Sequence, residues 1–285
     1  MSRIAQLLCL ALILSAVCAA GCGKKQRAAP PDVKTRYQFN VAGQHWRVKL
    51  TINHQPAYTV EGWSAIADVT HFVVDGKNMV RIEAERMQHG LPETFRKCDI
   101  RFVSMPAGAS GPAQPKTIGG IYDDGSSNKA RLEGTFEFKA SVPARWTWQD
   151  ADDIGQLTDA DKQEILAVVS QVAAAYRRKD WKAVRSMPLG MWPGGQGTGL
   201  GPGPPDAEAR AEKFFKKIFA HPDYTVEVAA AEDIRFAAGS KLVQISAGPD
   251  AIIHVGRPKS AGQGVSTGPS RMSFVKKGGV WHWMF

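Results

Sequence analysis

The sequence predicts two domains, an all-β antiparallel sandwich followed by an α+β domain in which helices pack on a curved antiparallel sheet. Between residues 35 and 150, apolar residues recur at every second position in short runs separated by turn residues. This pattern is typical of antiparallel sandwiches. From residue 156 the apolar spacing becomes helical, and from residue 224 the alternation returns. Helices followed by a run of strands indicate an α+β domain.

The first 21 residues have the order of a secretion signal. Arg3 precedes an apolar run over residues 4–17, which is shorter than the roughly 20 apolar residues needed to cross a bilayer core. Small residues at 19–21 then lead directly to Cys22. This order resembles a bacterial lipoprotein signal, although Ala19 stands where that family usually has leucine. The resemblance implies that Cys22 is the lipid attachment site and carries acyl chains such as palmitate. An ordinary cleaved signal with incidental cysteines is the alternative.

Residues 22–34 are predicted to be a lipidated tether. Lys24, Lys25 and Arg27 would lie at an anionic membrane surface, and the following Pro-rich segment is typical of a short, stiff, unfolded linker. Position 23 is glycine, whereas an aspartate directly after the lipidated cysteine often retains such lipoproteins at the inner membrane. The resemblance therefore implies a bacterial cell-envelope protein, lipid-anchored to the outer membrane and facing the periplasm.

Alternation predicts the strands of the sandwich over residues 35–150. The run 46–52 places four apolar side chains on one face, and similar runs occupy 79–85, 98–105 and 135–142. Asp75-Gly76 signals a tight turn before the second run. Cys98 alternates with apolar residues, which predicts a buried thiol and not a reactive one.

One segment of the sandwich carries a more specific pattern. Asn53 follows a strand, Asp68-Val69-Thr70 comes next, and Gly76-Lys77-Asn78 begins an alternating aliphatic strand. Residues 50–85 therefore resemble the galactose-binding-like, jelly-roll domains that accompany glycosidases. The resemblance implies a jelly-roll fold, and many such domains only support a neighbouring domain. Trp63 is a candidate for stacking on a glycan, and a core tryptophan is the alternative.

The second domain is predicted over residues 156–285. Thr158 and Asp161 form a near capping box before a long amphipathic helix, and a short helix follows around Trp181. The Gly/Pro-rich segment 189–205 lacks the signature of a phosphate-binding loop and is interpreted as a flexible lid or an insertion. A third helix then precedes predicted strands at 224–230, 241–247, 251–257, 271–277 and 280–285. The last two strands are expected to form a hairpin across Gly278-Gly279.

The opening helix with "YRRKDWKAV" and the closing "SFVKKGGVWHWMF" resemble the nuclear transport factor two-like, or SnoaL-like, superfamily with its cystatin-like cone. The resemblance implies a cone-shaped α+β domain that encloses a pocket. The aromatic candidates for lining that pocket are Tyr176, Phe214, Tyr224, Trp281 and Trp283. The candidate acids or bases are Asp233, His254 and His282. The alternative is that the aromatic residues simply form the core.

Composition narrows the possible functions. The net charge is +9, but the basic residues are spread through the chain and no nucleic-acid motif is present, so no nucleic-acid partner is expected. The seven histidines show no paired ligand spacing, and neither a metal nor a cofactor is predicted. The expected function is non-catalytic binding of a small ligand, a glycan or an envelope protein. The alternatives are a SnoaL-like enzyme of the isomerase or dehydratase type acting on a small hydrophobic substrate, and a scaffold for protein–protein interaction.

Overall fold

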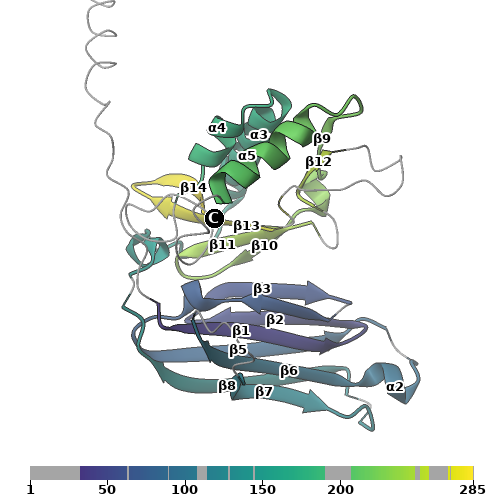
Figure 1. Ribbon diagram of the computed structural model, residues 1–285. Helices are drawn as coiled ribbons and strands as arrows, with labels where there is room; N and C mark the ends of the chain where they lie inside the picture. Colours follow the sequence, from purple (N-terminus) through teal and green to yellow (C-terminus); the bar gives the residue numbers. More distant parts are fainter. Residues whose placement is uncertain are drawn as a thin grey trace, which may run out of the picture.

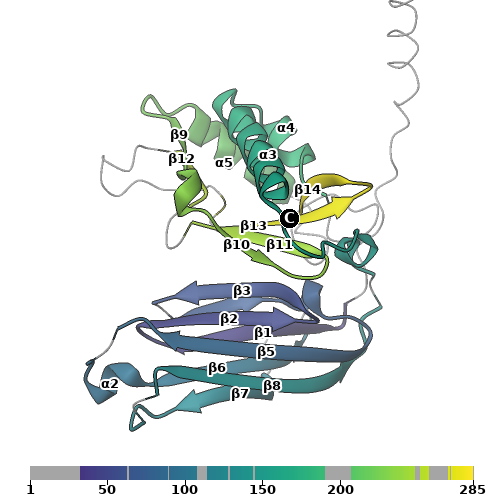
Figure 2. The same ribbon diagram turned by 180° about the vertical axis from the view of Figure 1, so that it is seen from behind.

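The computed structural model describes residues 33–62, 64–88, 90–107, 114–127, 129–143, 145–189, 207–247, 251–256, 269 and 271–284. Antiparallel sheets dominate it and stack in layers, with the longer helices on one outer side (Figures 1 and 2). The prediction of a mostly antiparallel β chain is thereby confirmed. The signal segment, Cys22, Trp63 and residues 190–205 lie outside the described ranges. Within those ranges, no helix is both long and apolar enough to cross a membrane.

The N-terminal part consists of two facing four-stranded sheets, which give it a sandwich-like architecture. The first sheet has the order β4-β1-β6-β7 and contains β1 (Thr35–Gly43), β4 (Ala65–Asp68), β6 (Cys98–Pro106) and β7 (Lys116–Asp123). The second has the order β3-β2-β5-β8 and contains β2 (Trp46–Ile52), β3 (Gln55–Glu61), β5 (Gly76–Arg86) and β8 (Arg131–Ala140). All neighbouring strands are antiparallel.

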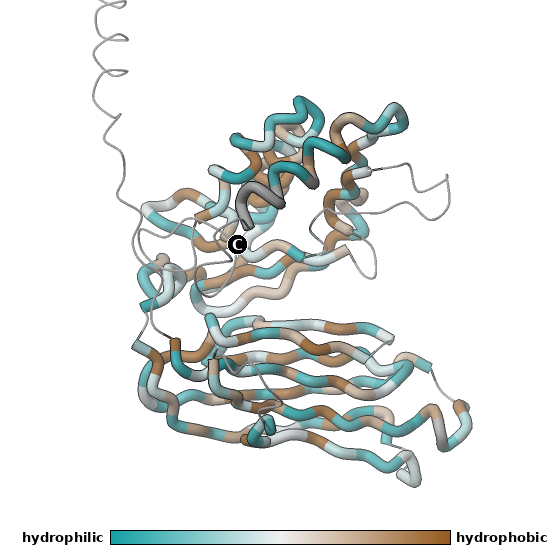
Figure 3. Tube along the Cα trace, viewed as in Figure 1, coloured by the Kyte–Doolittle hydropathy of each residue, from teal (hydrophilic) through white to brown (hydrophobic). Residues whose placement is uncertain are grey.

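The alternating sequence pattern places one side of each strand in the core between these sheets. Figure 3 shows hydrophobic and hydrophilic segments alternating along the strands. In β2 the residues at 46, 48, 50 and 52 are all buried, as the sequence predicts. The predicted strands at 79–85 and 98–105 lie within β5 and β6. The strand expected at 135–142 instead begins at Arg131, because β8 pairs with β5 over nearly its whole length.

The asparagines of the jelly-roll-like segment tie three loops together. Asn53 has a left-handed backbone (φ 51°) in the turn between β2 and β3, and its side-chain amide donates to Asn78 Oδ1 at 2.8 Å and to the carbonyl of Phe72 at 3.1 Å. Asn78 is fully buried; it donates to the carbonyl of Val74 and accepts from the amide of the same residue, both at 2.8 Å. These motif residues satisfy buried backbone groups and need no ligand for that role.

Asp68 and Thr70 anchor a second loop in the same way. The Thr70 hydroxyl donates to Asp68 Oδ1 at 2.6 Å and accepts from the backbone amide of Tyr37 at 2.9 Å. Thr70 begins the short helix η1 (Thr70–Phe72) and is fully buried. The polar residues that carry the resemblance are thus explained by their structural role.

The C-terminal part places helices over one face of a four-stranded antiparallel sheet. The helices are α3 (Asp159–Arg177), α4 (Trp181–Ser186) and α5 (Ala207–Phe219). The sheet has the order β10-β11-β13-β14 and contains β10 (Arg235–Ala238), β11 (Leu242–Ser246), β13 (Arg271–Lys277) and β14 (Val280–Met284). A two-stranded sheet pairs β9 (Thr225–Val228) with β12 (Ile253–Gly256). The remaining short helices are α2 (Glu93–Arg96), η2 (Thr147–Asp150) and η3 (Ala231–Asp233).

The central strands β11 and β13 of this sheet carry buried residues on both faces. Val243 and Phe274 pack in the core beneath the helices, whereas Leu242, Val275 and Met284 join the core of the sandwich. Successive side chains along β11 and β13 therefore point alternately into the two cores. Figures 1 and 2 show the sheet between the helices and the sandwich.

Gln55 connects the two parts through hydrogen bonds. Its side chain is 1% exposed, donates to Ser240 Oγ at 2.6 Å and accepts from the backbone amide of Lys241 at 3.1 Å. A Cβ at Gly239 would lie 2.5 Å from the carbonyl oxygen of His54, so the two segments of the chain approach too closely there for any other residue.

Candidate functional site

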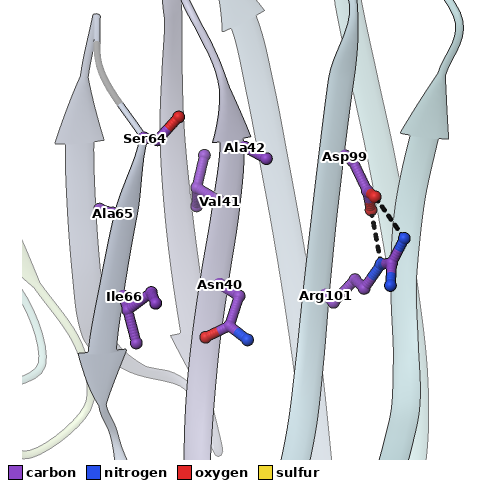
Figure 4. A pocket seen from close by; sticks show the side chains of 8 residues that line it. All are labelled: Asn40, Val41, Ala42, Ser64, Ala65, Ile66, Asp99 and Arg101. Atoms are coloured by element: carbon purple, nitrogen blue, oxygen red, sulfur yellow. Dashed lines mark hydrogen bonds and ion pairs between the residues drawn. The ribbon is translucent and has the colours of Figure 1, made fainter.

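The outward face of the sheet β4-β1-β6-β7 carries a hollow of about 540 Å³. Figure 4 shows its lining side chains on three neighbouring strands. They are Asn40, Val41, Ala42, Ser64, Ala65, Ile66, Asp99 and Arg101. A second hollow of about 410 Å³ shares Ala42, Ser64 and Asp99 with the first and extends to Phe95 and Tyr122. The two hollows are therefore continuous across the sheet.

Strand register assembles this surface from distant parts of the chain. Asn40 on β1 lies opposite Ile66 on β4 and Arg101 on β6, and this forms one outward row. The next row runs from Ala42 through Asp99 to Tyr122 on β7. We call these six residues together with Phe95 the outer-face strip.

An ion pair supplies the polar centre of the strip. Arg101 donates from Nε to Asp99 Oδ1 at 2.9 Å and from Nη2 to Asp99 Oδ2 at 2.5 Å (Figure 4). Both side chains face outward because the two residues are two positions apart on β6. The hydrogen bond to Asp99 and its negative charge raise the pKa of Arg101 further above its ordinary value. The fork-to-carboxylate geometry presents two planar polar groups in a fixed orientation.

Asn40 adds a hydrogen-bonding group that the protein leaves unused. Its Oδ1 is buried and has no hydrogen-bond partner among the described residues. Leaving a buried acceptor unsatisfied costs about 1–3 kcal/mol. A donor from a bound molecule would remove that penalty.

Exposed apolar side chains border the polar centre. Ile66 is 72% exposed, Tyr122 70% and Phe95 44%. Ile66 borders the first hollow, and Phe95 and Tyr122 border the second, so all three lie on the same outward face. The strip therefore combines aromatic and aliphatic surface with an amide, a carboxylate and a guanidinium.

Cys98 lies at the base of the second hollow but supplies no nucleophile. It is 1% exposed, which confirms the predicted buried thiol. Burial, followed by the negative charges of Asp123 and Asp99, raises its pKa to about 12. The thiol therefore stays protonated at neutral pH, and the thiolate is the reactive form.

The aromatic residues predicted to line a pocket lie mostly in the core beneath the helices. Trp281 and Trp283 are 3% and 6% exposed, and Tyr176 is also buried. Tyr224 is half-buried and donates its hydroxyl to the carbonyl of Tyr176 at 2.6 Å. Phe214 belongs to α5, and its side chain lies outside the described part of the chain. None of these residues lines the two hollows described above.

The predicted acids and bases lie on three different elements. Asp233 is exposed in η3, and His254 is buried on β12 opposite Glu227. His282 is half-buried on the opposite side of β14 from Trp281. A catalytic role for these three residues stays a prediction. No group of His, Cys, Asp and Glu within the described ranges could hold a metal ion.

Asp161 is the acid that contacts the aromatic core, although the sequence indicates only a helix cap. It accepts from the Thr158 hydroxyl at 2.7 Å, from Lys276 Nζ at 2.8 Å and from the Trp281 indole at 3.0 Å. The hydrogen bond from Lys276, followed by those from Thr158, holds its pKa well below the usual range. Because all its lone pairs point at protein donors, we assign it a structural role.

The sequence matches no protein-family model, and searches of curated proteins and of solved structures find no similar chain.

Proposed function

We propose that this protein is a lipid-anchored cell-envelope protein that binds a glycan on the outer-face strip. The observation that carries the proposal is the position of Tyr122, which is 70% exposed and lies in the same cross-strand row as Asp99. A sugar ring presents apolar C–H faces and paired hydroxyls. The exposed aromatic ring can stack on the C–H faces, and the carboxylate and guanidinium beside it can bind the hydroxyls.

The polar groups of the strip match the hydrogen-bonding needs of hydroxyl groups. A hydroxyl both donates and accepts, so it can donate to Asp99 or to Asn40 Oδ1 and accept from Arg101. Because Arg101 and Asp99 are already paired in the free protein, little side-chain freedom remains to be lost on binding. The mixed, shallow surface favours a neutral polar ligand over a purely apolar one.

The remaining assignments form one proposal with the binding site. Cys22 would hold the chain in the outer membrane, facing the periplasm. Residues 35–150 would form a jelly-roll-like domain and residues 156–285 a SnoaL-like cone. The burial of Trp281 and Trp283 supports a packing role for the aromatic residues of that second domain and a non-catalytic protein.

The test is isothermal titration of the mature protein in detergent with soluble peptidoglycan fragments and N-acetylglucosamine oligomers. Tyr122→Ala should weaken binding about tenfold, which corresponds to about 1.4 kcal/mol. Arg101→Gln should weaken it as well. Arg131→Gln is the matched control, because Arg131 also pairs with a carboxylate two positions along its strand, with Nε 2.6 Å from Glu133 Oε1. Absence of binding to every oligosaccharide, or equal affinities for Tyr122→Ala and wild type, would contradict the proposal.

A further inference from the structure

A third hollow lies where the sandwich meets the C-terminal sheet, and it shares no lining residue with the outer-face strip. Its volume is about 440 Å³, within the usual range for small-molecule sites. We call it the junction groove. The lining residues that matter for its chemistry are Arg47, Lys49, Glu61, Arg235, Gln244 and Ser246.

Strand alternation explains why these polar side chains meet. On β2 the neighbours of Arg47 and Lys49 are buried in the sandwich core, so both cations lie on the outward side of that sheet. On β11, Val243 and Ile245 pack beneath the helices, so Gln244 lies on the side that faces the sandwich. The groove is therefore built jointly by both parts of the chain.

Positive charge is in excess in the groove. Glu61 Oε1 lies 2.9 Å from Arg47 Nε and 2.6 Å from Arg235 Nη1, so one carboxylate serves two guanidinium groups. Lys49 adds a third cation, and it makes no ion pair with any described residue. Arg47 Nη1 also lies 3.6 Å from Glu85 Oε2, so the three cations against these two carboxylates leave one positive charge in excess. Each guanidinium has five N–H donors, so both keep donors that Glu61 does not use.

Gln244 adds an amide to the same lining. The residue is 7% exposed, and no side-chain hydrogen bond joins its amide to the described residues. The amide can therefore donate to, or accept from, a molecule in the groove. The neighbouring Ser246 and Thr59 place hydroxyl groups in the same lining.

We propose that the junction groove binds a small organic anion through a carboxylate or phosphate group. Its anionic oxygens would accept hydrogen bonds from Lys49, Arg235 and the Gln244 amide, while Phe236 supplies apolar contact for the rest of the molecule. Since Lys49 belongs to the sandwich and Arg235 and Gln244 to the C-terminal sheet, the anion would link the two parts. This site is independent of the glycan-binding proposal.

The test is isothermal titration of the full mature chain with three probes that share a ring and differ in the head group. They are phenyl phosphate, benzoate and benzyl alcohol. At least one anion should bind, the neutral alcohol should not, and added KCl should weaken the binding. Binding of phenyl phosphate alone would identify a phosphate site, and binding of benzoate alone a carboxylate site. The proposal is overturned if neither anion binds more tightly than benzyl alcohol.

Variants then locate the binding. Arg235→Gln and Gln244→Met should each weaken the anion at least tenfold, while melting temperatures without ligand stay close to that of wild type. Lys139→Gln is the control, because it removes the same charge from an exposed position on β8. Equal affinities in Arg235→Gln and Lys139→Gln would also overturn the proposal. Arg235 is more than half exposed, so this variant remains informative even if Gln244→Met fails to fold. Tyr122→Ala should leave anion binding unchanged, which separates this outcome from that of the glycan site.

Discussion

Replacing Asp161 by asparagine should destabilise the protein at neutral pH. One carboxylate oxygen accepts from the backbone amide and the hydroxyl of Thr158, and the other accepts from Lys276 Nζ and the Trp281 indole. An asparagine keeps one acceptor oxygen and turns the other position into a donor, so one pair of donors must lose its partner. Each pair consists of two hydrogen bonds, so at about 1 kcal/mol for each bond the loss of either pair costs about 2 kcal/mol.

The expected loss is therefore about 2 kcal/mol, to which the lost attraction to Lys276 adds. A loss of this size lowers the melting temperature of a chain of this length by roughly 4–8 °C. The pKa of Asp161 is lowered in the folded protein, so the charged side chain stabilises the fold above its unfolded pKa of about 3.9. That contribution is lost as the pH falls through the folded-state pKa. The difference between variant and wild type should accordingly shrink in acid.

Thermal melts at pH 7 and at about pH 3 measure both effects. Asp159→Asn is the matched control, because Asp159 lies in the same helical turn but its side chain is 94% exposed. It should melt close to wild type at both pH values. An Asp161→Asn protein that melts with wild type at pH 7, or that keeps its full deficit in acid, would refute the reasoning.

Three further predictions follow from local features. In the folded mature protein Cys98 should react with iodoacetamide at pH 8 far more slowly than after denaturation, since burial raises its pKa to about 12; equal rates would contradict its burial. Gly239→Ala should lower stability by about 1–3 kcal/mol in a urea melt, because the new Cβ would lie 2.5 Å from the His54 carbonyl oxygen, whereas the exposed Ala238→Gly should have a much smaller effect. Cys22→Ser should remove the lipid, as read by mass spectrometry, and globomycin should leave the precursor uncleaved; an unchanged mass in both tests would rule out lipidation.

Local sequence patterns predicted the elements that depend on nearby residues. The period-two run at 46–52 places its four apolar residues in the core, and Thr158 caps α3 by accepting from the Asp161 amide at 3.1 Å. The predicted hairpin at Gly278-Gly279 joins β13 and β14, and both glycines have positive φ. Each of these depends on side chains within a few positions of one another, and such interactions can be recognised in a single sequence.

The candidate sites could not be predicted in this way because they depend on strand register. Asn40 meets Arg101 only through the pairing of β1 with β6, and no local pattern sets that register. The contact between Gln55 and Ser240 joins positions 185 residues apart. Gln244 stands in an alternating run as an ordinary polar position, and its burial follows only from the packing of β11 against the sandwich. Sequence reasoning therefore selected the conspicuous aromatic residues, which the fold mostly buries in its core.

The position of the outer-face strip relative to the predicted anchor limits what it can reach. Asn40 lies five positions beyond Thr35, the start of β1, which is about 17 Å along the strand. If Cys22 carries the lipid, residues 23–34 span at most about 43 Å. The strip would then stay within roughly 60 Å of the membrane surface, so a glycan polymer lying near the membrane is a more suitable ligand than a distant one.

Shortening the tether tests this geometry separately from the binding chemistry. Deleting residues 28–32 removes about 17 Å of reach but none of the strip, and it keeps Val33, which packs against the sandwich core. The purified variant should bind oligosaccharides as tightly as wild type, because the contacts are unchanged, while its crosslinking to the cell-wall glycan in intact cells should fall. A Gly/Ser segment of equal length at the same place should restore the crosslinking, since only reach is required. Crosslinking that is unaffected by the deletion would show that the anchor does not set the distance to the ligand.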